Sequence, residues 1–140
     1  MTRKGPSKSA DKTFADGRLK VARAFMKAAQ TEAALAEEAD IANPIVSQTV
    51  QAAIAYTDAL TASVAGQVNQ QDHAGAVKAL RSALGKRLPG EQERRLARIL
   101  GEKDAAQYSA RPKRISEARR LLADLESYAA WAELELARTR

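Results

Sequence analysis

Among its 140 residues the chain has no cysteine and only one histidine. Without cysteine, a disulfide-linked scaffold and a thiolate metal site are both excluded. A zinc site would have to combine His73 with carboxylates, and a Ser-His-Asp hydrolase would have to use this histidine as its base. We therefore expect neither a metal nor a cofactor, and the lack of cysteine fits a cytoplasmic protein.

Long hydrophobic runs are missing as well. No apolar stretch approaches the roughly 20 residues of a membrane-spanning helix. The basic first residues are not followed by the apolar segment of a secretory signal peptide. Hydrophobic residues still make up 45% of the chain, which at this length is enough for the core of one domain. We expect a single domain with no membrane span.

Aromatic residues are scarce, at 4% of the chain, and no segment alternates apolar and polar residues in the way a strand does. Strong helix formers, above all alanine, dominate the composition. The sequence therefore predicts an all-α protein, with four or five antiparallel helices in an up-and-down bundle. This domain should span residues 11–140, after a disordered basic tail at residues 1–10.

Capping residues, proline and glycine predict where the helices begin and end. Either Ser9 or Asp11 can cap the first helix, and an asparagine followed by proline opens the second. The expected helices run from Ser9 or Asp11 to Ala39, from Asn43 to about Val68, from Asp72 to Leu84, from Pro89 to Tyr108 and from Ser116 to Ala137.

The second of these helices has almost no charge. Residues 43–76 contain no lysine or arginine, and the only acids are Asp58 and Asp72. Such a helix must be covered on most sides, either at the centre of the bundle or by a second subunit. Asp58 needs a partner or a raised pKa. Either it joins Lys103 and Tyr108 in a phosphate or nucleotide pocket, or it is a structural carboxylate bonded to a tyrosine, a lysine or a helix end.

Three segments, together with the basic loop and final helix that follow them, carry a family resemblance. They are Ala53-Ile-Ala-Tyr-Thr-Asp58-Ala, Asp72-His73-Ala-Gly-Ala-Val-Lys-Ala-Leu and Leu96-Ala-Arg-Ile-Leu-Gly-Glu-Lys103-Asp104-Ala-Ala-Gln-Tyr108-Ser. In this pattern residues 42–134 resemble the HEPN family, small helical bundles found in prokaryotes beside nucleotidyltransferases and in toxin or defence loci. The resemblance implies a five-helix bundle that is commonly dimeric.

Active members of that family carry an endoribonuclease motif in which arginine is followed by roughly four to six residues and then histidine. The corresponding residues here are Lys103 and Tyr108, so both positions of the motif differ. A tyrosine, with an ordinary pKa around 10, is a poor base for the attacking 2'-hydroxyl of RNA. The resemblance therefore favours a protein without nuclease activity, with Asp58, Lys103, Tyr108 and His73 as the candidates if cleavage survives.

The net charge of +6 suits an anionic partner. The densest group of cations lies on the fourth helix, the loop after it and the start of the last helix. No aromatic residues or glycines are interleaved with them, so the pattern favours phosphate contacts over reading of bases. A solvated charged face is the alternative reading. The candidate residues are Arg94, Arg95, Arg98, Arg111, Lys113, Arg114, Arg119 and Arg120.

The leading hypothesis is a cytoplasmic, homodimeric, HEPN-like bundle that binds RNA or a nucleotide-bearing partner through this basic cluster, in a toxin–antitoxin or defence context. One alternative is a weak or altered ribonuclease. Another is a protein–protein adaptor in which the acidic end of the first helix and the uncharged second helix contact a partner subunit. The acids of that helix end are Glu32, Glu37, Glu38 and Asp40.

Overall fold

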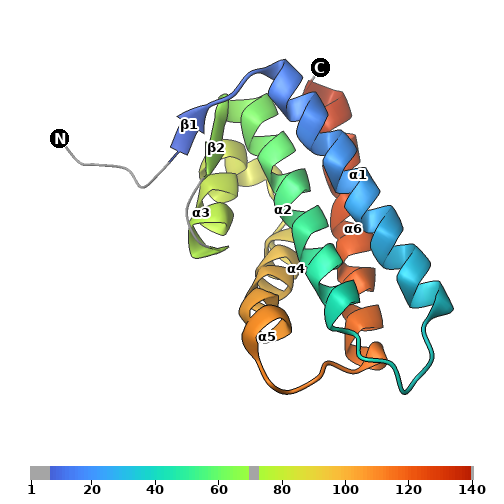
Figure 1. Ribbon diagram of the computed structural model, residues 1–140. Helices are drawn as coiled ribbons and strands as arrows, with labels where there is room; N and C mark the ends of the chain where they lie inside the picture. The colour runs from blue at the N-terminus through green and yellow to red at the C-terminus, as the bar shows by residue number, and fades with distance from the viewer. Residues whose placement is uncertain (1–6, 70–72, 140) are drawn as a thin grey trace.

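The computed structural model describes residues 7–69 and 73–139, which form a helical bundle with one short β-ribbon (Figure 1). The predicted helical class is confirmed. In chain order the elements are β1 (Ser7–Ser9), α1 (Lys12–Leu35), α2 (Asn43–Ala65), β2 (Gln67–Asn69), α3 (His73–Leu84), a 3-10 turn (Gly85–Arg87), α4 (Gly90–Gly101), α5 (Lys103–Tyr108) and α6 (Ile115–Thr139).

Helix α2 lies at the centre of the bundle. It packs against α1, α3, α4, α5 and α6, and α1, α2 and α6 run alongside one another (Figure 1). Side chains around most of α2 are buried, including those of Ile45, Val50, Tyr56 and Leu60. Packing within one chain therefore accounts for the missing charge of this helix, and no second subunit is needed to cover it.

Helix α1 begins as predicted but ends earlier. The Asp11 carboxylate accepts a hydrogen bond of 2.9 Å from the Phe14 backbone N–H, so Asp11 caps the helix. The helix ends at Leu35, before the expected Ala39. The guanidinium of Arg119, from α6, donates to the carbonyl oxygens of Ala33 and Ala36. A cation from another helix thus satisfies the last carbonyls, where the local sequence offers only acids.

Asn43 does not cap α2, although the sequence predicts that it does. Residue 42 occupies the cap position and makes no side-chain cap bond. The Asn43 amide nitrogen instead donates to the carbonyl oxygen of Ala106 over 2.9 Å. Its amide oxygen accepts from the Lys113 backbone N–H over 2.8 Å. Asn43 therefore fastens α5 and the loop after it to the first turn of α2.

The ribbon corrects two predicted boundaries. Helix α2 ends at Ala65 instead of near Val68, because Gly66 adopts a left-handed conformation with φ of 65°. The chain then forms β2, which pairs antiparallel with β1. Residues 7–10 of the predicted tail therefore belong to the fold, since the Ala10 N–H also bonds to the Gly66 carbonyl oxygen, whereas residues 1–6 lie outside the described residues. A three-residue strand is too short to show an alternating pattern.

The predicted fourth helix, from Pro89 to Tyr108, is divided into α4 and α5. The break is at Glu102, whose backbone N–H bonds back to the carbonyls of Ile99 and Leu100. The Glu102 carboxylate lies 2.6 Å from the Lys113 ammonium. This ion pair holds the chain at the bend, so a contact with the following loop accompanies a break that no proline marks.

The contacts of Asn43 lead to a prediction about stability. Asn43→Ala removes the partners of one carbonyl and one backbone N–H in a half-buried position, so we expect a loss of about 2 kcal/mol in the free energy of unfolding. Urea unfolding measures this change, with Gln107→Ala, an exposed residue of α5, as the control. Equal stability of the two variants would show that Asn43 does not fasten α5 to α2.

Candidate functional site

The residues predicted for catalysis do not meet in one site. Lys103 and Tyr108 are the first and last residues of α5, which is bonded to the N-terminal turn of α2 through Asn43. Asp58 lies 15 residues further along α2, about 22 Å along the axis at 1.5 Å per residue. Tyr108 is 78% exposed. His73 is the first residue of α3, and its side chain lies outside the described residues. The proposed pocket joining Asp58 to Lys103 and Tyr108 is therefore not formed.

Asp58 is a structural carboxylate whose partner is an arginine. The Arg18 Nε and a terminal guanidinium nitrogen each lie 3.1 Å from the same Asp58 oxygen. Burial raises the pKa of Asp58 to about 6, and the positive charge of Arg18 opposes that rise. Sequence reasoning missed Arg18, although a signal was present. Arg18 follows Ala15 by three residues and precedes Ala22 by four, and both alanines are buried, so Arg18 borders the buried face of α1.

Further polar contacts join α2 to α6 beside this pair. The hydroxyls of Thr57 and Tyr128 lie 2.7 Å apart in the core. Burial raises the pKa of Tyr128 well above its ordinary value, so this phenol stays protonated. The Tyr128 ring also packs against Trp131, with 5.6 Å between ring centroids. The contact between Thr57 and Tyr128 links α2 to α6, and Tyr128 offers no base for catalysis.

Salt bridges and hydrogen bonds neutralise most of the predicted basic cluster. Arg98 makes two hydrogen bonds to Asp124, of 3.1 and 3.2 Å, and Arg95 lies 3.9 Å from the same carboxylate. Lys113 pairs with Glu102 and lies 3.8 Å from Glu117. All of these residues except Arg95 line a groove of about 550 Å³ between α4, α6 and the loop before α6. The two further engaged cations are Arg111, which pairs with Glu117, and Arg119, which caps α1.

Three arginines of the cluster keep their charge available. Arg94, Arg114 and Arg120 are exposed, and in the described part of the chain none of them has a salt bridge or a hydrogen bond from its side chain. Arg120 lines the same groove as Arg98, and Arg94 precedes Arg98 by one helical turn. We call Arg94, Arg114 and Arg120 the arginine surface. It can bind anions, whereas the remaining cations of the cluster support the fold.

Two further findings concern the described residues, 7–69 and 73–139. No group of three or more histidines, aspartates and glutamates is placed to hold a metal ion. No helix is long and apolar enough to cross a membrane.

Comparison with known proteins adds no assignment. No protein-family model matches the chain, and no curated protein is significantly similar to it in sequence.

The raised pKa of Asp58 predicts how stability depends on pH. Asp58 in the folded protein, with its pKa of about 6, binds a proton more tightly than in the unfolded chain, where the ordinary value is 3.8. The contribution of Asp58 to stability is therefore lost as pH rises from about 4 to about 6. Relative to the wild type, Asp58→Asn should gain up to about 3 kcal/mol over this range, at 1.36 kcal/mol per pKa unit.

Urea unfolding of both proteins between pH 4 and pH 7 measures this gain. Loss of the Asp58–Arg18 ion pair changes the free energy of unfolding of Asp58→Asn at every pH. The informative quantity is therefore how the difference between the two proteins changes with pH. Arg18→Gln serves as a second variant, because removing the guanidinium should move the titration of Asp58 above pH 6. A stability difference that stays constant across the range would contradict the burial of this carboxylate.

Proposed function

We propose that the protein is a non-catalytic, HEPN-like helical bundle that binds RNA through phosphate contacts at the arginine surface. One observation carries the proposal: Arg94, Arg114 and Arg120 are exposed and form no salt bridge with any described residue, although acids neutralise most of the cations around them. A homodimer, a cytoplasmic location and a role in a toxin–antitoxin or defence system belong to the same proposal and rest on the resemblance.

The chemistry of the surface fits a phosphate backbone. Guanidinium groups bind phosphate oxygens through pairs of parallel hydrogen bonds. The candidate cluster contains no aromatic side chain on which a base could stack, and stacking is how many single-strand-binding modules hold RNA bases. We therefore expect binding that depends little on sequence and falls as salt rises.

The dispersed catalytic candidates support binding without cleavage. Asp58 is committed to Arg18, and it lies far along α2 from Lys103 and Tyr108. Metal-free RNA cleavage needs an acid and a base close to one phosphate. Asp58 is too far from Lys103 and Tyr108 to act on the same phosphate, so a ribonuclease that combines these three residues is the less favoured alternative.

A salt titration of RNA binding tests the proposal. A fluorescent transfer-RNA pool is titrated with the wild type and with the triple variant Arg94→Gln, Arg114→Gln, Arg120→Gln at several salt concentrations. We expect the triple variant to bind more weakly at low salt. The slope of log affinity against log salt should fall by about 2, because three phosphate contacts are lost.

The matched control has the same net charge. Lys20, Lys78 and Lys86 are exposed and lie outside the arginine surface, so changing these three to glutamine should leave most of the affinity. Equal losses in the two triple variants would show that only the net charge matters and would contradict the proposed surface. The RNA is run on a gel afterwards. Shortening by the wild type but not by Tyr108→Phe would favour the ribonuclease instead.

A further inference from the structure

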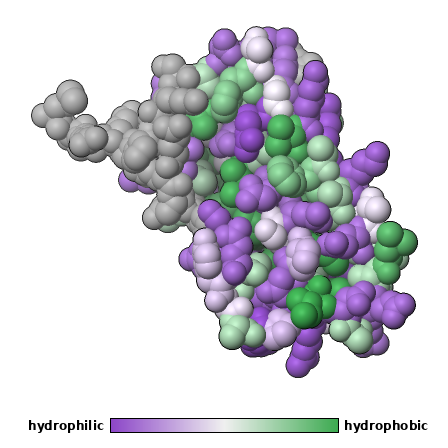
Figure 2. Space-filling model, in the orientation of Figure 1, coloured by the Kyte–Doolittle hydropathy of each residue, from purple (hydrophilic) through white to green (hydrophobic). Residues whose placement is uncertain are grey.

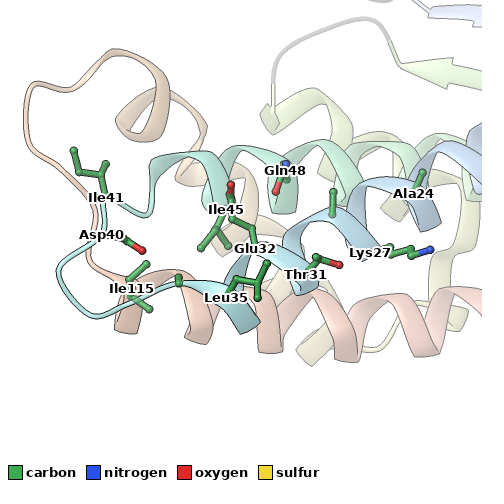
Figure 3. A pocket seen from close by; sticks show the side chains of 12 residues that line it. Ala24, Lys27, Thr31, Glu32, Leu35, Asp40, Ile41, Ile45, Gln48 and Ile115 are labelled. Atoms are coloured by element: carbon green, nitrogen blue, oxygen red, sulfur yellow. The ribbon is translucent and has the colours of Figure 1, made fainter.

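Two exposed hydrophobic residues border an open groove between α1 and α2 (Figure 3). Leu35, at the end of α1, is 78% exposed, and Ile41, in the following loop, is 61% exposed. Ile45 from α2 and Ile115 from α6 continue the apolar lining. On the face drawn in Figure 2, hydrophobic groups likewise interrupt the hydrophilic surface. The groove encloses about 800 Å³, and we call it the α1–α2 groove.

The shape of the groove suits a helix. On α1 the lining includes Ala24, Ala28, Thr31 and Leu35, which follow one another at helical spacing along one face. They span 11 residues, about 16 Å, or three turns of helix. Three of the four are small or medium-sized, so the backbone of a second helix can come close and seat its larger apolar side chains between them.

The charges beside the groove select the partner. Residues 28–42 contain no lysine or arginine, while four acids lie at the end of α1 and in the following loop. Glu32 and Asp40 line the groove itself. Glu32, Glu37 and Glu38 form no ion pair within the described residues. Lys27 is the single cation among the described residues of the lining, and the Arg119 guanidinium, outside the lining, is bonded to the carbonyl oxygens of Ala33 and Ala36. A partner that places lysine or arginine along this rim gains favourable interactions, whereas a phosphate backbone is repelled.

A polar atom at the base of the groove also lacks a partner. The side chain of Gln48 belongs to the lining, and its amide oxygen is buried without a hydrogen-bond donor in the described part of the chain. A buried acceptor normally has a donor. Because this oxygen is itself shielded from the groove, an occupant reaches it only if the Gln48 side chain rotates, so the choice of partner rests on the charges of the rim.

A second copy of the chain fits the groove poorly. A two-fold symmetric contact uses the same patch on both subunits. The acids beside one groove would then face the acids beside the other, and like charges at an interface oppose binding. The occupant is therefore a segment of a different protein.

We propose that the α1–α2 groove is a docking site for an amphipathic helix of another protein, with leucine- or isoleucine-type residues on one face and lysine or arginine along its flanks. The helix lays its apolar face against Leu35, Ile41 and Ile45, and its cations meet the acids of the rim. This mode of recognition uses apolar anchors at i, i+3 or i+4, and i+7. The lining shares no residue with the arginine surface, although Ile115 of the lining directly follows Arg114 in the chain. The two proposals rest on different observations.

Fluorescence anisotropy with designed peptides tests the docking site. The probe is a labelled Leu/Lys peptide of about 18 residues, with leucines at helical spacing, long enough to cover three turns of α1. A Leu/Glu peptide of the same pattern tests charge. A scrambled Leu/Lys peptide without an apolar face tests amphipathicity. We expect only the patterned Leu/Lys peptide to bind the wild type, with an affinity that falls as salt rises.

Matched variants locate the binding. Leu35→Ser and Ile41→Ser should each lower the affinity for the patterned Leu/Lys peptide about tenfold, because each removes an apolar side chain that anchors the peptide. Leu134→Ser removes a leucine that is 68% exposed on α6, outside the groove, and should change nothing. All three positions are exposed, so folding should be retained, which circular dichroism checks. The triple arginine variant should bind the peptide like the wild type.

Three results would overturn the proposal. One is no binding of the patterned Leu/Lys peptide at its solubility limit. Another is equal binding of the Leu/Glu or the scrambled peptide. The third is equal weakening by Leu35→Ser and Leu134→Ser. Sedimentation of the unliganded protein tests the second copy directly, because a dimer that Leu35→Ser converts to a monomer would make this groove a self-interface.

Discussion

Burial of the uncharged helix α2 on almost every side is the constraint on which the rest of the structure depends. A helix with no lysine, arginine or glutamate cannot stay in water along most of its length, because its apolar surface would remain hydrated. Five other helices therefore pack around it. Each of these helices covers a different part of α2, and this sets its position in the bundle. The short α5 and the loop after it cover its beginning, where Asn43 holds them.

Polar groups inside such a helix need partners within the bundle, and α2 satisfies them in two ways. The threonine hydroxyls bond to carbonyls four residues earlier, as Thr49 does to Ile45 and Thr57 to Ala53. Asp58 has no such option, because a carboxylate only accepts hydrogen bonds, and Arg18 reaches it from α1. The ion pair therefore links α1 to α2, the two helices with the most extensive contact. Burial still disfavours the charged form of Asp58.

Charge on the outside of the molecule is divided between two regions of opposite character. Cations outnumber acids on α4, in the loop 109–114 and in the first turns of α6, where only part of them is neutralised. Acids dominate at the end of α1, and the one cation placed among its last carbonyls, Arg119, comes from α6. The net charge of +6 therefore does not describe any single surface. An anionic partner and a cationic partner can bind at different places on the same bundle.

The sequence by itself determined the helical class and the approximate extent of five helical segments. It also required the uncharged α2 to be covered, but left open whether the bundle or a second subunit covers it. These features depend on local periodicity, capping and composition, which a single chain displays. The Asp11 cap is one such local feature, and the structure has it where the sequence predicts it.

Only the tertiary structure decided which charged residues stabilise the fold and which remain available. The side chain of Arg98 bonds to that of Asp124, which lies 26 residues away in the sequence. The side chain of Arg119 bonds to the carbonyl oxygen of Ala33, which lies 86 residues away. The sequence places Arg94 and Arg98 on one face of one helix, yet only Arg98 pairs with Asp124. Asp58 and Lys103 likewise look alike as candidates until the fold separates them. Helix register and packing set these distances, and neither is encoded in spacing along one chain, because each depends on how several helices fit together.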